Sequence, residues 1–156
     1  MPRSVRRRLV LTGVAACAIL GGPVAVAQAS DNTLRATLNA AAPKIQHDEN
    51  AVKSGLSNYP KGKVRPLVRA LNHEVADLHA LNKKLKHESA SSSAGRKAKK
   101  DIVRGLGLIA TAYTALGNDV KAANGGPVPA SEVNTAVHTD KQGRTKLLAG
   151  LKLLGG

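Results

Sequence analysis

The sequence predicts an all-α protein, an antiparallel up-down-up-down bundle of four helices that follows an export signal. In four stretches, apolar residues recur at alternating four- and three-residue steps, which is the spacing of a helix with one buried face. Short links rich in glycine, proline, serine and asparagine separate the stretches, and such links favour antiparallel neighbours. The 156 residues include no Phe, no Trp and two Tyr, so the core must be aliphatic.

The first 29 residues are typical of a secretory signal peptide. They contain, in order, arginines at positions 3, 6, 7 and 8, an uncharged and mostly apolar segment over 9–27, and the cleavage sequence Ala27-Gln28-Ala29. Cleavage after Ala29 would leave residues 30–156 as the bundle domain. We therefore predict a bacterial protein that is secreted or held at the cell envelope.

The leader leaves other fates open. Val14-Ala15-Ala16-Cys17 is similar to a bacterial lipoprotein cleavage box, which would place a lipid on Cys17, although the residues that follow stay apolar. The uncharged segment is also just long enough for an uncleaved membrane anchor, and the arginine run permits a twin-arginine signal. Because Cys17 is the single cysteine, the domain itself would contain no disulfide.

The first helix of the domain should begin near Asp31, where Asp31 or Asn32 can cap the free backbone N–H groups. Pro43 removes one backbone hydrogen bond, so the helix should kink there or split just before it. The apolar row comprises Leu34, Leu38, Ala41, Ile45 and Val52, with Asp48 among them. The turn-forming residues within 54–63 predict a loop.

The second helix is predicted over residues 64–88, with Pro66 in its first turn. Its row consists of Val64, Val68, Leu71, Val75, Leu78 and Leu85, with Asn82 as the polar member, and Leu67 and Leu81 widen it. The opposite side carries three lysines, and His73, Glu74 and Asp77 lie near that side. His73 and Asp77 lie off the apolar row, so we expect these two side chains to face solvent.

The third helix is predicted over residues 96–123, after a flexible connection at 89–95. Its row consists of Ala98, Ile102, Leu106, Ile109, Tyr113, Leu116, Val120 and Ala123. Gly105, Gly107 and Gly117 should each weaken this helix by roughly 1 kcal/mol relative to alanine, unless they allow a neighbouring backbone to approach closely.

The fourth helix should begin at Ser131, a good N-cap residue, with Glu132 in its first turn. Its row consists of Val133, Val137, Leu147, Leu151 and Leu154, with Asp140 and Arg144 in the middle. Asp140 and Arg144 also have the four-residue spacing and the order that favour an ion pair on one helix.

Four polar residues lie on the apolar rows: Asp48, Asn82, Asp140 and Arg144. They either fix the register of the helices, as buried polar residues do in coiled coils, or line a cavity. Small residues at Gly105, Gly143 and Gly150 could leave room for such a cavity. The second interpretation predicts a carrier of a small apolar or metal ligand inside the bundle.

The leading functional prediction rests on charge. The leader holds four arginines and no acidic residue, which leaves the domain with 20 basic and 10 acidic side chains and a net charge of +10. Eight cations flank the serine-rich connection and should meet at one end of the bundle; we call them the basic tip: Lys83, Lys84, Lys86, Arg96, Lys97, Lys99, Lys100 and Arg104. A focused positive field favours polyanions. We predict that the tip binds an anionic envelope polymer or anionic lipid; the other interpretation is a solvated cap.

No arrangement of residues predicts catalysis, so we expect a protein that is not an enzyme and that has no cofactor. The five histidines at 47, 73, 79, 87 and 138 form no Glu-x-x-His or His-Glu-x-x-His pattern, and no Gly-x-Ser-x-Gly sequence is present. The near absence of aromatic side chains removes the surfaces on which nucleic-acid bases stack. Sequence-specific nucleic acid is therefore not an expected partner, and the sequence does not predict an oligomeric state.

Overall fold

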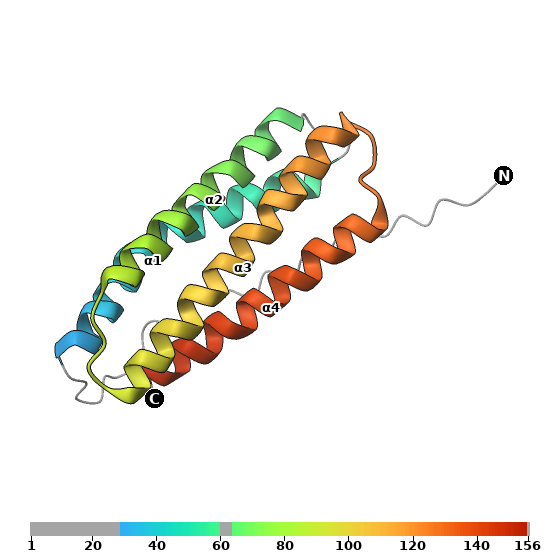
Figure 1. Cartoon of the computed structure of the whole chain (residues 1–156). Coiled ribbons are helices and arrows are strands. Elements are labelled where there is room, and N and C mark those ends of the chain that lie inside the picture. The colour runs from blue at the N-terminus through green and yellow to red at the C-terminus, as the bar shows by residue number, and fades with distance from the viewer. Residues whose placement is uncertain (1–28, 60–63, 156) are drawn as a thin grey trace.

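The computed structural model describes residues 29–59 and 64–155, and within them it contains four long helices and no strand (Figure 1). The helices are α1 (Ala29–Asn58), α2 (Val64–His87), α3 (Ser93–Ala123) and α4 (Ala130–Gly155). The prediction of an all-α four-helix bundle is confirmed. The predicted leader up to Gln28, which includes Cys17, lies outside the described residues. No helix of the described part is both long and apolar enough to cross a membrane.

Hydrogen bonds between helices show which ends of the helices lie together. Thr37, near the start of α1, donates its hydroxyl to Glu88, just after α2, with an oxygen–oxygen distance of 3.0 Å. Lys99, near the start of α3, donates its ammonium group to the carbonyl oxygen of Lys86 at the end of α2, at 2.9 Å. Figure 1 shows the chain reversing at each connection, so these contacts join the beginning of one helix to the end of its neighbour.

The first helix is longer than predicted and is not split. α1 runs through Pro43 and past Gly55 to Asn58, so a split before Pro43 is excluded and the predicted start of the loop at residue 54 is wrong. The last turns of α1 pack on α2: a Cβ atom on Gly55 would lie 2.9 Å from a methyl carbon of Leu67, and Leu56 packs against the core. This packing outweighs the low helix propensity of glycine. A kink at Pro43 stays a prediction.

Two other helix starts differ from the prediction by a few residues. α3 starts at Ser93, because the hydroxyl of Ser92 accepts a hydrogen bond from the backbone N–H of Gly95 at 2.8 Å and caps the helix. It ends as predicted, before Asn124 in the left-handed conformation. α4 begins one residue before Ser131, which was the predicted cap.

The backbones of α3 and α4 pack against each other through glycines. A Cβ atom on Gly105 would lie 2.6 Å from the backbone nitrogen of Leu147, and one on Gly143 would lie 2.8 Å from the carbonyl oxygen of Gly105. A Cβ atom on Gly150 would lie 2.7 Å from the carbonyl oxygen of Ala98. Real Cβ atoms do not occur at such distances, so these positions require glycine.

This close approach rotates the buried face of α4 away from the predicted row. Val137 is 40% exposed, whereas its neighbour Ala136 is 7% exposed. The buried positions of α4 are Ala136, Asp140, Gly143, Gly150 and Leu154, which again follow four- and three-residue steps. The larger Leu147 and Leu151 lie beside this face and are only partly buried.

The bundle is left open along one side. α1 packs on α2 and α4 packs on α3, but α1 and α4 make few contacts with each other. The core between the helices is aliphatic, as predicted, and Tyr113 is its buried aromatic residue. We call the open side between α1 and α4 the α1–α4 seam.

Candidate functional site

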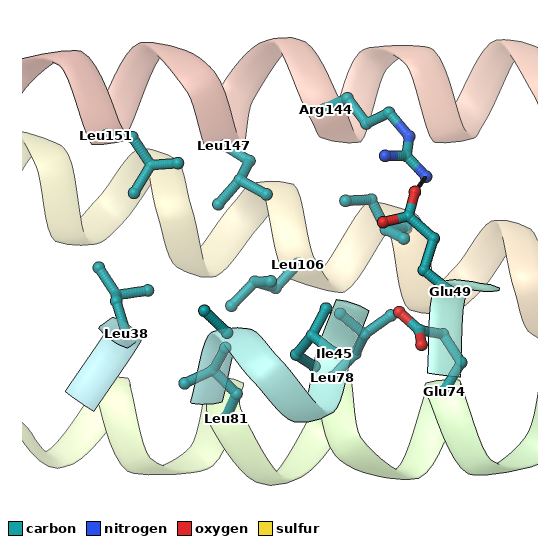
Figure 2. A pocket seen from close by; sticks show the side chains of 12 residues that line it. Leu38, Ile45, Glu49, Glu74, Leu78, Leu81, Leu106, Arg144, Leu147 and Leu151 are labelled. Atoms are coloured by element: carbon teal, nitrogen blue, oxygen red, sulfur yellow. Dashed lines mark ion pairs between the residues drawn. The ribbon is translucent and has the colours of Figure 1, made fainter. Parts of the chain in front are cut away.

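A groove lies along the α1–α4 seam and reaches side chains of all four helices (Figure 2). Its volume is about 640 Å³, part of which is open to solvent. Nine of its twelve lining residues are apolar: Leu38, Ala42, Ile45, Leu78, Leu81, Leu106, Ile109, Leu147 and Leu151. The other three, Glu49, Glu74 and Arg144, lie together at one end, which we call the polar end of the seam groove.

Arg144 holds the polar end together. From α4 its Nη2 atom lies 2.8 Å from Glu49 Oε1 on α1 and donates a hydrogen bond to the hydroxyl of Tyr113 on α3 at 3.0 Å. Its Nε atom donates to Asp140 at 2.8 Å, which confirms the predicted pair on α4. The guanidinium group therefore joins three helices: two of its five N–H donors meet carboxylates and a third meets the hydroxyl of Tyr113.

Glu74 is the buried acid of the groove, although the predicted row of α2 placed it near the opposite, lysine-bearing side. The residue is 2% exposed, and its Oε2 atom has no hydrogen-bond partner within the described part of the chain. Burial raises the pKa of Glu74 to about 8, and the negative charges of Glu49 and Asp48 add to this rise while Arg144 opposes it. In the folded protein, Glu74 therefore keeps its proton through most of the neutral range.

The burial of Glu74 follows from a second apolar row on α2. The buried residues of α2 include Leu67, Leu71, Leu78, Leu81 and Leu85, and Glu74 continues their four-three spacing. The valines of the predicted row are only partly buried, because this leucine row is the one that faces the bundle interior. Five leucines interrupted by one glutamate were thus the sequence signal for a buried acid.

Two aspartates lie behind the polar end. Asp77 forms an ion pair with Lys44 of α1, and its side chain is 15% exposed, so the expectation that it faces solvent is wrong. His73, by contrast, is exposed as expected. Burial and a hydrogen bond to Asp77 raise the pKa of Asp48. Acidic side chains thus outnumber cations around this end of the groove.

Both interpretations of the polar residues on the apolar rows apply, each to different residues. Asn82 donates its side-chain amide to the carbonyl oxygen of Val103 on α3 at 3.1 Å, which fixes the register of α2 against α3. Arg144 lines the groove, and Asp140 orients it.

The basic tip lies where α2 ends and α3 begins. Seven of its eight residues are exposed, and Lys99 is half-buried. The ammonium group of Lys99 donates to the carbonyl oxygens of Lys86 and Glu88, at 2.9 and 2.5 Å, and so caps the last turn of α2.

Two further cations of the tip also have partners within the protein. Lys97 lies 3.8 Å from the carboxylate of Asp101, and Arg96 donates to the carbonyl oxygen of Ser91 at 2.6 Å. Some of the cations of the basic tip therefore stabilise the connection between α2 and α3 by bonding to groups of the protein itself.

The five histidines are exposed, and none of them lines the groove. His138 contacts Gln142, four residues later on α4, at 2.9 Å. Among residues 29–59 and 64–155, no three His, Cys, Asp or Glu side chains are grouped so that they could hold a metal ion.

No protein-family model, no curated protein and no solved structure shows a significant match to this chain.

Proposed function

We propose that the protein is a non-catalytic, exported helical bundle that binds a small apolar ligand in the seam groove. The observation that carries this proposal is the groove itself: nine apolar side chains from four helices line a hollow that opens between α1 and α4. Apolar surface in contact with water is unfavourable by roughly 25 cal/mol per Å². A ligand that covers the groove would recover that free energy.

The close packing of α3 and α4 supports this role. Because Gly143 and Gly150 draw α4 onto α3, the neighbouring Leu147 and Leu151 cannot be covered by α1 without moving α4 away. Leu147 and Leu151 therefore remain free to contact a ligand on one wall of the groove, opposite Leu38 of α1 (Figure 2). The signal peptide predicted from the sequence would place this binding at the cell envelope or in the medium.

The test is calorimetric titration of the purified protein with decanol, a neutral amphiphile. Ala42 lines the groove, and Ala40 lies exposed on the other side of α1. An Ala42→Phe substitution should fill the groove and weaken binding at least tenfold, whereas Ala40→Phe should leave it unchanged. Circular dichroism of both variants shows whether the bundle is intact. Equal binding by the two variants, or no binding by the unmodified protein, would reject the groove as a ligand site.

A second candidate function is binding of an anionic polymer or anionic lipid through the basic tip. The observation that favours it is the meeting of Lys83, Lys84 and Lys86 with Arg96, Lys97, Lys99, Lys100 and Arg104 at one end of the bundle. Release of counterions should make such binding fall steeply with salt.

The matching experiment reverses three charges at the tip and three elsewhere. Lys83, Lys84 and Lys100 are exposed at the tip, and Lys53, Lys121 and Lys141 are exposed outside it. If the tip is the site, the first triple Lys→Glu variant loses salt-sensitive binding to anionic vesicles and the second keeps much of it. Equal losses would attribute the attraction to the net charge of the whole protein.

A further inference from the structure

We propose that the occupant of the seam groove is an amphiphile with a primary ammonium head, whose head pairs with the carboxylate of Glu74 while its alkyl chain lies along the apolar wall. This inference rests on the proposed function and adds the chemistry of the ligand to it. The groove supplies both parts of such a site, because it is apolar over most of its length and acidic at one end.

The first argument is the unpaired state of Glu74. The residue is 2% exposed and lines the groove, and its Oε2 atom has no hydrogen-bond partner within the described residues. A buried polar atom without a partner is unfavourable, and more so if it is charged. A donor brought in by the ligand would remove this cost, so the position of Glu74 selects ligands that carry a donor.

The second argument is the local balance of charge. Besides Glu74, which is protonated in the empty groove, four carboxyl groups from three helices surround the polar end: Asp48, Glu49, Asp77 and Asp140. Two cations face them, Lys44 paired with Asp77 and Arg144 paired with Glu49 and Asp140. The deficit of positive charge favours a cationic head over a neutral or anionic one.

The third argument excludes the other head groups. A carboxylate ligand would have to compete with Glu49 and Asp140 for Arg144, and it would bring a further negative charge beside Glu74. A quaternary ammonium group lacks the N–H donors that Glu74 needs and prefers a cage of aromatic rings. A primary ammonium group offers three donors on a compact cation, which suits a single buried carboxyl group.

Binding of the ammonium head transfers one proton to the solvent. Glu74 binds the ligand as a carboxylate, so the carboxylic acid of the empty groove releases its proton to the buffer when the ammonium group arrives. The groups that face Glu74 and influence this step are Glu49 and Asp48 of α1, Asp77 of α2, Tyr113 of α3 and Arg144 of α4. None of them supplies the missing donor to Oε2.

The experiment compares three probes of one chain length, decylamine, decanol and decanoate, by calorimetric titration at neutral pH. An alkyl ammonium group is charged there, as lysine is. We expect the protein to bind decylamine roughly ten- to hundredfold more tightly than decanol, which is the range of a charge-assisted hydrogen bond. The net positive charge of the protein would by itself favour decanoate, so this order would have to come from the groove.

Two variants locate the effect. Glu74→Gln should remove the preference for decylamine and keep the affinity for decanol, whereas Glu132→Gln, which removes an exposed carboxylate at the start of α4, should behave as the unmodified protein does. Retained decanol binding by Glu74→Gln also shows that the variant is folded.

The outcomes separate the inference from the function on which it rests. Equal affinities for the three probes, tightest binding of decanoate, or a decylamine preference that survives in Glu74→Gln would overturn the ammonium site and leave the apolar groove standing. Failure of all three probes to bind would overturn both.

Discussion

At the scale of single residues, Glu74 is the side chain whose position makes the strongest prediction. It occupies one place in a row of buried leucines, and burial raises its pKa to about 8 from an ordinary value of 4.5. Between these two pH values the folded protein binds a proton that the unfolded chain has lost. The free energy of unfolding should therefore fall as the pH rises from about 4.5 to about 8, by roughly 3–5 kcal/mol from this group.

The measurement is chemical denaturation of the unmodified protein and of Glu74→Gln at several pH values between 4 and 9. Because glutamine cannot ionise, the variant should lack this part of the pH dependence. The two proteins should differ least near pH 4, and the variant should be the more stable one above pH 8. Parallel stability curves would contradict the assignment of a buried, proton-binding Glu74.

Lys99 shows how a residue of the basic tip also supports the fold. Its ammonium group caps the carbonyl oxygens of Lys86 and Glu88, so Lys99→Ala should lower the free energy of unfolding by about 1 kcal/mol. The exposed neighbour Lys100 is the control, and Lys100→Ala should change stability by less than about 0.5 kcal/mol. Urea denaturation measures the free energy of unfolding of both variants, and an equal loss in the two would contradict a capping role for Lys99.

At the scale of the elements, the glycines of α3 have two different roles. A Cβ atom on Gly105 would contact the backbone of α4 at 2.6 Å, whereas one on Gly107 would lie 3.6 Å from the side chain of Asn82, an ordinary contact. Gly117 is similar to Gly107, since its nearest neighbour would be a methyl group of Leu71 at 3.8 Å. The expectation of close approach therefore holds for one of the three glycines.

This difference predicts opposite effects of the same substitution within one helix. Gly107→Ala should stabilise the protein by about 0.5–1 kcal/mol, because alanine favours the helix. Gly105→Ala gains the same propensity but forces α3 and α4 apart, and overpacking of this kind costs about 1–3 kcal/mol. Thermal denaturation should show a higher Tm for the first variant and a lower one for the second. A higher Tm for both variants would mean that α3 and α4 can move apart without a loss of stability.

At the scale of the whole molecule, the open seam makes α1 the least supported helix. α1 packs extensively on one neighbour, α2, whereas α2 and α3 each pack extensively on two neighbouring helices. Amide hydrogen exchange should therefore be faster in α1 than in α2 and α3 under native conditions. A ligand in the groove would bridge α1 and α4, and it should slow exchange in both. Unchanged exchange in α1 at saturating decylamine would place the ligand elsewhere.

The sequence alone determined the helical class, the aliphatic core and most helix ends. These features depend on apolar spacing and on turn residues, which act over a few positions of the chain. The ion pair of Asp140 with Arg144 was predictable for the same reason, since both residues lie on one helix. The placement of the basic tip was predictable because its two halves flank one short connection.

The tertiary structure alone decided the groove and its acidic end. Which of two overlapping rows on α2 is buried depends on how α1 and α3 pack against it, and that choice placed Glu74 inside. Whether a helical glycine is only a weak helix former or a close contact depends on the neighbouring backbone, which decided that α4 lies on α3 and leaves the seam open. The physical reason is the same in both cases: periodicity marks the sides of a helix that can be buried, and only packing determines which of them is covered.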